Sequence, residues 1–342
     1  MRPIRVLIVE DSMVFRELLV QNLNKDPAIE VVAVAKDPFE ARDAIIKSKP
    51  DVMTLDVELP RMSGIEFLQK LMPQYPLPVV VISALSDKVF DALNAGAVDF
   101  VAKPTVTGRA QLVDFIQNEL LVKIKIASTA KISRIKQQTV MNEQPGLTAK
   151  NPNVLVAIGA STGGTEAIYS VVKDFGVDIP GVIIVQHMPP GFTAMYAKRL
   201  DDQCRVHVKE AQTGDKVMPG HVLIAPGGDR HMHLVKVNGV YQVEIKPGPK
   251  VNGHCPSVDV LFDSVAKVAG SKALGIILTG MGGDGAKGLL AMRKAGARTI
   301  GQDESTCVVY GMPKVAYDIG AVEYQEKLQD IAKKTYAVLN KM

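Results

Sequence analysis

The chain has 342 residues, of which 47% are hydrophobic and 22% are charged, and its formal net charge is +4. This length predicts two or three domains, and the weak, evenly mixed charge does not indicate a nucleic-acid partner. No apolar run approaches the roughly 20 residues that span a bilayer, and the N-terminus does not have the layout of a signal peptide. We therefore expect a cytoplasmic protein without direct membrane insertion, with its three cysteines (Cys204, Cys255, Cys307) reduced.

Residues 1–126 alternate short apolar runs with helical patterns, which predicts a doubly wound α/β domain with a parallel sheet covered on both faces. The predicted strands are Val6–Val9, Val31–Ala35, Val52–Leu55, Val79–Ile82 and Phe100–Ala102. The predicted helices are Ser12–Leu23, Pro38–Ile46, Gly64–Leu71, Lys88–Ala95 and Ala110–Ile126. Residues 127–152, which are polar and contain prolines, are expected to form a linker.

A second alternating series over residues 153–342 predicts another doubly wound, Rossmann-like domain. Its predicted strands are Val154–Ile158, Val182–Val185, Val206–Lys209, His221–Ala225, Gly275–Leu278 and Arg298–Gly301. Its predicted helices are Glu166–Lys173, Phe192–Asp201, Val258–Val268 and Ala286–Ala295. Leu234–Lys246, with Asn238-Gly239 at its centre, predicts a small inserted β-hairpin.

Three carboxylates fall at strand ends of the first domain. Glu10 and Asp11 follow the first predicted strand, and Asp56 follows the third. Because the carboxyl ends of parallel strands meet at one edge of the sheet, these acids should repel one another unless a cation lies between them. Mg²⁺ is the natural ion for such oxygen ligands. Ser83 and Lys103 end the next two strands, and their hydroxyl and ammonium groups suit a phosphoryl group attached to one of the acids.

In the second domain, Ser161 lies in Gly159-Ala-Ser161-Thr-Gly163, directly after a predicted strand and before a helix. This is the G-x-S-x-G spacing of a nucleophile elbow, in which glycines permit a sharp turn that presents the hydroxyl at the sheet edge. A serine needs a base to become a useful nucleophile. His187 ends the next strand, and Asp284 lies in a third strand-to-helix turn, so both are expected on the same edge.

The order Ser…His…Asp differs from the Ser…Asp…His order of α/β-hydrolases, so that fold is not expected. A rival interpretation is a dinucleotide fingerprint, because Gly280-x-Gly282-x-x-Gly285 follows a strand and Asp303 follows the next one. Asp284 would then lie inside the turn that must receive a pyrophosphate, which disfavours nucleotide binding. A metal at His231-x-His233 and a thiol nucleophile at His254-Cys255 are weaker alternatives.

The first domain resembles the receiver domain of bacterial response regulators, which has a flavodoxin-like fold. The matching residues are Glu10-Asp11, Asp56, Leu59-Pro-Arg-Met-Ser-Gly64, Ser83-Ala84 and Lys103-Pro104. The resemblance implies that Asp56 accepts the phosphoryl group and that Glu10, Asp11, Asp56 and the carbonyl of Glu58 hold Mg²⁺. It also implies that Ser83, the backbone N–H of Ala84 and Lys103 hold the phosphoryl oxygens, with Phe100 as the switch aromatic.

Nearly the whole chain resembles the chemotaxis response regulators that are protein-glutamate methylesterases. The resemblance rests on five strings: Gly159-Ala-Ser-Thr-Gly-Gly-Thr-Glu166, Gln186-His-Met-Pro-Pro-Gly-Phe192, Pro256-Ser-Val-Asp-Val-Leu-Phe262, Leu278-Thr-Gly-Met-Gly-Gly-Asp-Gly285 and Val309-Tyr-Gly-Met-Pro313. It implies a triad of Ser161, His187 and Asp284, with oxyanion donors from the backbone N–H groups of Thr162 and Met281 and no cofactor in the esterase domain.

The resemblance also implies the partners and the regulation. The substrates would be methylated glutamates, and also glutamines, of chemoreceptors, and the phosphodonor would be the chemotaxis histidine kinase. The receiver is expected to lie over the esterase edge and to open access when Asp56 is phosphorylated. An alternative keeps the second domain as a nonenzymatic sensor that docks in response to phosphorylation.

Overall fold

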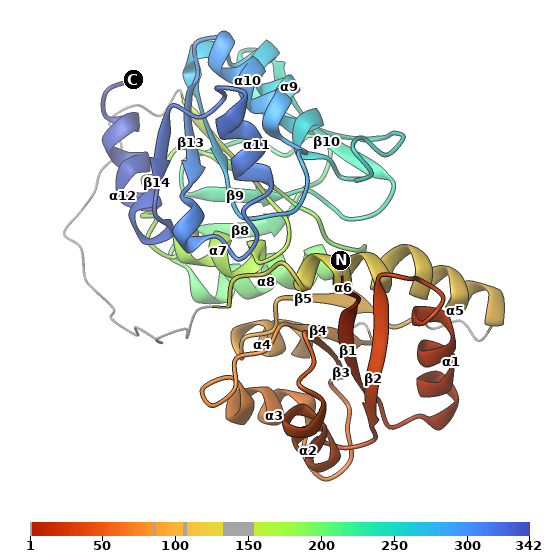
Figure 1. The fold of residues 1–342 in the computed structure, drawn as a ribbon. Coiled ribbons are helices and arrows are strands. Elements are labelled where there is room, and N and C mark those ends of the chain that lie inside the picture. Colours follow the sequence, from red (N-terminus) through yellow and green to blue (C-terminus); the bar gives the residue numbers. More distant parts are fainter. Residues whose placement is uncertain (1, 85–86, 105–107, 133–153) are drawn as a thin grey trace. The chain divides into compact units, whose positions relative to one another are not determined.

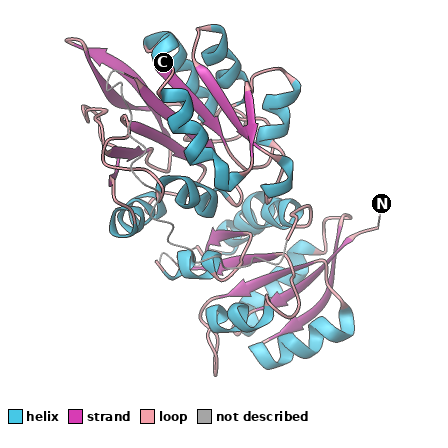
Figure 2. Cartoon of the chain, turned by 90° about the vertical axis from the view of Figure 1, so that its left-hand side faces the viewer, coloured by secondary structure: helices cyan, strands magenta, loops and turns pink. Residues whose placement is uncertain are grey.

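The computed structural model describes residues 2–84, 87–104, 108–132 and 154–342 of the chain (Figure 1). The chain divides into two compact units, Met1–Thr139 and Val140–Met342. Each unit is a parallel β-sheet flanked by helices, as Figure 2 shows in a second view. The predicted linker over residues 127–152 lies outside the described residues from residue 133 onward. No helix in the described part of the chain is long and apolar enough to cross a membrane.

Five parallel strands form the sheet of the first unit, in the order β2-β1-β3-β4-β5. They are β1 (Ile4–Val9), β2 (Ile29–Ala35), β3 (Val52–Asp56), β4 (Val79–Ser83) and β5 (Asp99–Ala102). The central strands β3 and β4 are buried over their whole length, because helices cover both faces of the sheet. This strand order is the flavodoxin-like one, and it confirms the predicted fold class.

Three of the helices in the first unit begin at side chains that satisfy free N–H groups of the first turn. The helices of this unit are α1 (Met13–Leu23), α2 (Pro38–Ser48), α3 (Gly64–Leu71), α4 (Lys88–Asn94), α5 (Arg109–Phe115) and α6 (Leu121–Ala127). Ser12 caps α1, Asp37 caps α2, and Ser63 forms a capping box with Glu66 at α3. The single helix predicted over Ala110–Ile126 is divided by a π-helical segment, Ile116–Leu120.

Seven parallel strands form the sheet of the second unit, in the order β14-β13-β12-β6-β7-β9-β8. They are β6 (Leu155–Ala160), β7 (Val182–Gln186), β8 (His207–Glu210), β9 (His221–Ile224), β12 (Ala273–Ile277), β13 (Arg298–Gln302) and β14 (Tyr324–Glu326). The strand order reverses between β6 and β12. In open parallel sheets, ligands bind beyond the carboxyl ends of the strands at such a reversal.

Helices cover both faces of this second sheet (Figure 1). They are α7 (Gly164–Val172), α8 (Phe192–Gln203), α9 (Val258–Val268), α10 (Ala286–Lys294), α11 (Met312–Asp318) and α12 (Leu328–Leu339). Helix α10 packs against α9 and α11, whereas α12 packs against α7. The helices of the second unit thus form two groups, one on each face of the sheet.

The predicted hairpin is present as β10 (Arg230–Val237) and β11 (Val240–Pro247). Asn238 and Gly239 have φ angles of 48° and 82°, which are the positive values that a tight hairpin turn requires. The hairpin buries Met232, Leu234 and Val243 in the same core cluster as α9. It therefore covers the helix whose N-terminus faces the candidate site.

Candidate active site

Ser161 directly follows β6, at the reversal of the strand order. Its N–H donates to Thr279 O at 3.0 Å, and its own carbonyl accepts from Gly164 N at 2.7 Å. Gly163 has a φ of 74°, which a side chain rarely adopts, and α7 begins at the next residue. The chain thus turns sharply from strand to helix at Ser161.

Close packing explains three of the glycines around this serine. A Cβ at Gly159 would lie 2.2 Å from Val258 Cγ1, and one at Gly164 would lie 2.2 Å from Gln186 Oε1. A Cβ at Gly280 would lie 2.8 Å from the Cβ of Ser161. The loops that follow β6 and β12 therefore approach each other more closely than larger residues would permit.

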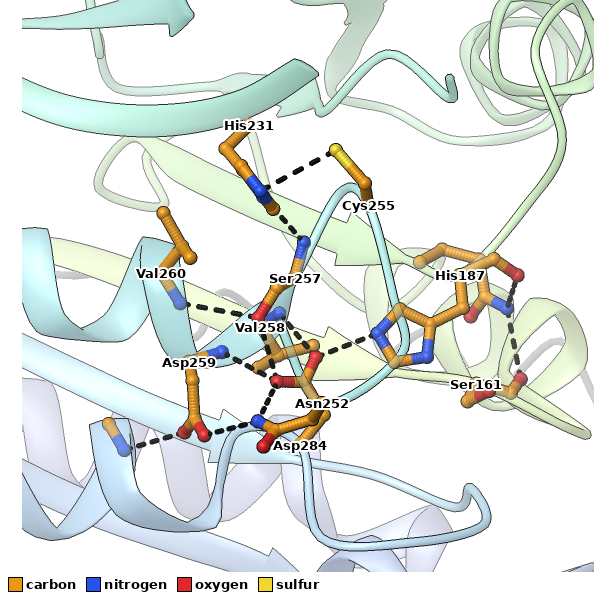
Figure 3. A network of polar contacts seen from close by, with 12 residues as sticks. Ser161, His187, His231, Asn252, Cys255, Ser257, Val258, Asp259, Val260 and Asp284 are labelled. Atoms are coloured by element: carbon orange, nitrogen blue, oxygen red, sulfur yellow. Dashed lines mark hydrogen bonds and ion pairs between the residues drawn. The ribbon is translucent and has the colours of Figure 1, made fainter. Parts of the chain in front are cut away.

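His187 follows β7, and its imidazole lies between Ser161 and Asp284 (Figure 3). Its Nε2 is 2.8 Å from Oδ2 of Asp284. Its Nδ1 is buried, has no hydrogen-bond partner in the described part of the chain, and points to the side of Ser161. No hydrogen bond joins the Ser161 hydroxyl to this ring among the described residues. Catalytic hydrogen bonds of this kind often tighten only when substrate binds.

Asp284 lies in the loop that precedes α10 and is 1% exposed. Its carboxylate contacts the N-terminus of α9. Its Oδ1 accepts from Ser257 Oγ at 2.7 Å and from Asn252 Nδ2 at 2.9 Å, and its Oδ2 accepts from Val258 N at 2.7 Å. Burial by itself raises the pKa of Asp284. The hydrogen bonds from His187, Asn252 and Ser257 outweigh burial and hold this pKa well below its usual range.

The ionised state of Asp284 determines which nitrogen of His187 carries the proton. A carboxylate only accepts hydrogen bonds, so Nε2 of His187 must donate to it. The neutral ring then has its lone pair on Nδ1, the atom on the side of Ser161. This is the arrangement in which an imidazole can take a proton from a serine hydroxyl.

The sequence did not predict three neighbours of these residues. Asn252 bridges the carboxylates of Asp284 and Asp259, and Ser257 caps α9 while it also donates to Asp284. The His254 ring stacks on His187, with the ring centroids 3.7 Å apart and the planes at 9°. Ser257 lies in one of the strings that carried the family resemblance, but no spacing rule connects Asn252 or His254 with Asp284.

The two expected oxyanion donors belong to two different loops, which follow β6 and β12. Thr162 follows Ser161 in the chain, and its carbonyl accepts from Thr279 Oγ1 at 3.0 Å. Met281 follows Gly280, which packs against Ser161, and its side chain is 42% exposed. Both backbones therefore lie next to the nucleophile.

The geometry argues against the alternative sites. Both ring nitrogens of His231 are engaged, with Ser257 N at 3.1 Å and Pro249 O at 2.9 Å, so this histidine is structural. His254 stacks on His187, whereas the Cys255 thiol contacts His231, so the two neighbours do not form a thiol–imidazole pair. The buried, ionised Asp284 would repel the pyrophosphate of a dinucleotide.

The acids of the first unit also converge. One carboxylate oxygen from each of Glu10, Asp11 and Asp56 lies within 4.8 Å of the other two. Lys103 Nζ lies 2.7 Å from Asp56 Oδ2 and 3.0 Å from Glu10, and the N–H of Glu58 donates to Asp56. Burial, and then the nearby Asp56, raise the pKa of Glu10 to about 7. A divalent cation would relieve this repulsion, so the donor set fits Mg²⁺.

The remaining predicted receiver residues lie in or directly after β4 and β5. Ser83 is the last residue of β4 and is buried, and the exposed Ala84 follows it. The carbonyl of Ser83 accepts from the N–H of Lys103 at 2.6 Å, and this bond joins the ends of β4 and β5. Phe100 is buried in β5, with its ring edge-on to Phe90 at 6.5 Å. The structure thus groups Ser83 and Lys103 with the acids and places Phe100 in the core.

Fold and site together define a protein in which a receiver-type unit with an acidic pocket precedes a hydrolase-type unit with a Ser-His-Asp centre. Residues 6–117 match the response regulator receiver domain, and residues 156–335 match the CheB methylesterase family. The chain belongs to the CheB methylesterase family.

Named relatives match almost the whole chain. The protein-glutamate methylesterase/protein-glutamine glutaminase 2 of Syntrophomonas wolfei is 63% identical over 342 residues, covering 100% of this chain and 99% of the relative. The corresponding protein of Syntrophotalea carbinolica is 52% identical, covering 99% of this chain and 98% of the relative. The crystal structure of the Thermotoga maritima CheB methylesterase catalytic domain is 38% identical, with a TM-score of 0.53, and covers 54% of this chain and 98% of that one.

Proposed function

We propose that this protein is a serine esterase that removes methyl groups from glutamate methyl esters of chemoreceptors and also deamidates receptor glutamines. The observation that carries the proposal is the polarised imidazole of His187, which is bonded to Asp284 through Nε2 and presents Nδ1 on the side of Ser161. The relatives with this activity in their names match the chain from end to end. Cys204, Cys255 and Cys307 are thiols and not disulfides, which supports a cytoplasmic location.

In the proposed mechanism, each residue of the site has a step in hydrolysis. Ser161 Oγ attacks the γ-carbonyl carbon, and its proton passes to Nδ1 of His187. The backbone N–H groups of Thr162 and Met281 stabilise the oxyanion. The bond to the methoxy oxygen then breaks, this oxygen takes the proton from His187, and methanol leaves. Water attacks the acyl-enzyme with the same proton transfers, and a glutamine amide follows the same route with loss of ammonia.

Asp284 does not change its protonation state in this scheme. It holds the His187 ring in one tautomer and stabilises the imidazolium that forms in each half of the reaction. Its own position is fixed by Ser257, Asn252 and the N-terminus of α9. The helix end adds a favourable field for the negative charge.

In the receiver unit, Asp56 accepts a phosphoryl group from the chemotaxis histidine kinase. Glu10, Asp11, Asp56 and the carbonyl of Glu58 would hold Mg²⁺, which neutralises charge on the carboxylates and on the incoming phosphoryl oxygens. Lys103, Ser83 and the N–H of Ala84 would bind those oxygens. The closeness of the buried Glu10 to Asp56 supports this assignment.

The esterase proposal is tested by methanol release from methylated receptor. Ser161→Ala is expected to lower kcat by at least about 1,000-fold because it removes the nucleophile. Ser271→Ala, at an exposed serine of the same unit, is the matched control and should retain full activity. Unchanged methanol release in Ser161→Ala would overturn the esterase proposal and favour the nonenzymatic sensor.

The receiver proposal is tested with a small phosphodonor such as acetyl phosphate. The wild-type chain should release methanol faster when both the phosphodonor and Mg²⁺ are present. Asp56→Asn should show only the basal rate, because the amide is not phosphorylated, and EDTA should have the same effect on the wild type. Stimulation that persists in Asp56→Asn would contradict the assignment of Asp56.

A further inference from the structure

Gln186 joins the backbones of two catalytic residues. It is the last residue of β7, and its side chain is buried. Its Nε2 donates to the carbonyl of Ser161 at 2.9 Å and to the carbonyl of His187 at 3.2 Å. One amide group therefore bonds to the residue that carries the nucleophile and to the residue that carries the base.

The Gln186 amide lies just beyond the last residues that β6 and β7 pair, next to Ser161 and His187. The pairing of β6 with β7 ends at Ala160 and Gln186, and the bond from His187 N to Ala160 O follows at 3.2 Å. Beyond it, the chain turns into α7 on one side and into the Pro189-Pro190 loop on the other. The Gln186 amide thus supplies hydrogen bonds between the two segments where the backbone pairing of β6 and β7 has ended.

The orientation of the amide is determined by its surroundings. If its oxygen and nitrogen were exchanged, the oxygen would face two carbonyl oxygens, which cannot donate a hydrogen bond. In the observed orientation, Oε1 is buried and has no partner in the described part of the chain. An unpaired buried oxygen destabilises a fold, so stability alone does not account for glutamine here. Gly164 leaves the space that this oxygen occupies.

We propose that Gln186 is a positioning residue for hydrolysis, which sets the separation between the Ser161 hydroxyl and the His187 imidazole. The inference rests on the proposed esterase function. Gln186 acts through backbone carbonyls and does not touch the reacting atoms. Displacing a nucleophile from its base by about 1 Å can cost about 100-fold in rate, whereas substrate binding elsewhere is unaffected. The effect should therefore appear in kcat and not in KM.

Gln186→Met tests the proposal in the full-length protein, because methionine fills the same space without a donor. We expect methanol release with kcat lowered by about 10- to 100-fold and KM within about twofold of wild type. Thr335→Val is the matched control: it removes a buried hydroxyl of α12 that bonds within its own helix, so kcat should not change. Wild-type kcat in a folded Gln186→Met protein would overturn the inference.

A second measurement does not depend on the receptor. The rate at which a fluorophosphonate labels Ser161, followed by intact mass, reports directly on the serine–histidine pair. We expect labelling of Gln186→Met to be at least about 10-fold slower than that of wild type, and an equal rate would overturn the inference. A wild-type protein that is labelled but releases no methanol would instead contradict the proposed substrate, and the labelling comparison would still decide the role of Gln186.

If Gln186→Met does not fold, Gly164→Ala applies the same test with Gln186 in place. Its new Cβ would lie 2.2 Å from Oε1 of Gln186 and 2.7 Å from the Cβ of Ala160, and the closer contact would displace the amide. Slower labelling at unchanged KM is the expected result. Wild-type labelling in a folded Gly164→Ala protein would overturn the proposal.

Discussion

Two buried carboxylates that share one partner differ in their electrostatics. Asp284 receives side-chain hydrogen bonds from His187, Asn252 and Ser257, and its pKa is lowered. Asp259 also accepts from Asn252, but burial dominates there and raises its pKa. Asn252 thus bridges a carboxylate that the site keeps ionised and one that is protonated more readily. The density of donors around Asp284 decides which of the two can orient the imidazole.

The lowered pKa of Asp284 predicts a pH-dependent contribution to stability. A carboxylate whose pKa falls on folding stabilises the fold above its unfolded value of 3.8, and the contribution is lost as pH falls toward the folded pKa. Asp284→Asn should therefore be less stable than wild type at pH 6, and the difference should shrink below pH 3.8. Urea unfolding at several pH values measures this difference, and a gap independent of pH would contradict the argument.

The same substitution should also impair catalysis. An amide at this position favours the wrong tautomer of His187, so kcat should fall by about 1,000- to 10,000-fold at neutral pH. Asp303→Asn provides a control. Asp303 is a partly exposed carboxylate that caps a short 3₁₀ helix, Glu304–Thr306, so this variant should have nearly wild-type kcat.

At the level of elements, contact between β6 and α9 positions the nucleophile relative to the carboxylate. Gly159 lies in β6, two residues before Ser161, and the side chain of Val258 occupies the space where its Cβ would be. The N–H of Val258 donates to Asp284 at 2.7 Å. A shift of α9 away from the sheet would therefore also move Asp284.

Gly159→Ala should force this shift and destabilise the protein by about 1–3 kcal/mol, as overpacking of a core does. It should also lower kcat. The Gly159→Ala, Val258→Ala double variant removes the clashing methyl groups and keeps the N–H of residue 258, so it should recover most of the stability and activity. Denaturant unfolding gives the coupling energy of the double-mutant cycle, and strictly additive costs would show that the two residues do not compete for space.

Most elements were predictable because their patterns are local. Short β-branched runs and capped helices gave nearly all strands and helices to within a few residues, and Asn238-Gly239 located the hairpin. No local pattern indicated an element after Gly301, although α11, β14 and α12 follow. Strand β14 has three residues and depends on pairing with β13, so it has no periodicity of its own. The π-helical segment within Ala110–Ile126 likewise has no local signature.

At the level of the whole molecule, every residue of the candidate hydrolytic centre belongs to the second unit, which has its own sheet and core. The proposed phosphorylation at Asp56 would therefore act on a centre that is already assembled. This favours regulation by access to the centre over regulation by its assembly.

The isolated residues 148–342 test this view. We expect them to release methanol several-fold faster than the unphosphorylated full-length chain and to be insensitive to phosphodonor, because the inhibiting receiver is absent. Full-length Asp56→Asn is the control and should stay at the basal rate. A fragment that is no more active than the unphosphorylated chain would rule out inhibition by the receiver.

Local patterns in the sequence were sufficient to predict the two α/β units and the acids that end or follow strands of the first. They also predicted Ser161, His187 and Asp284 in loops that follow strands of the second. They could do so because parallel strands bring their carboxyl ends to one edge whatever the details of packing. How these residues are held became evident from the three-dimensional contacts. The contacts of Asn252 and Ser257 with Asp284, the stacking of His254, and the link from Gln186 to Ser161 join segments far apart in the chain or depend on side-chain direction. Such contacts follow from three-dimensional packing, which no local pattern specifies.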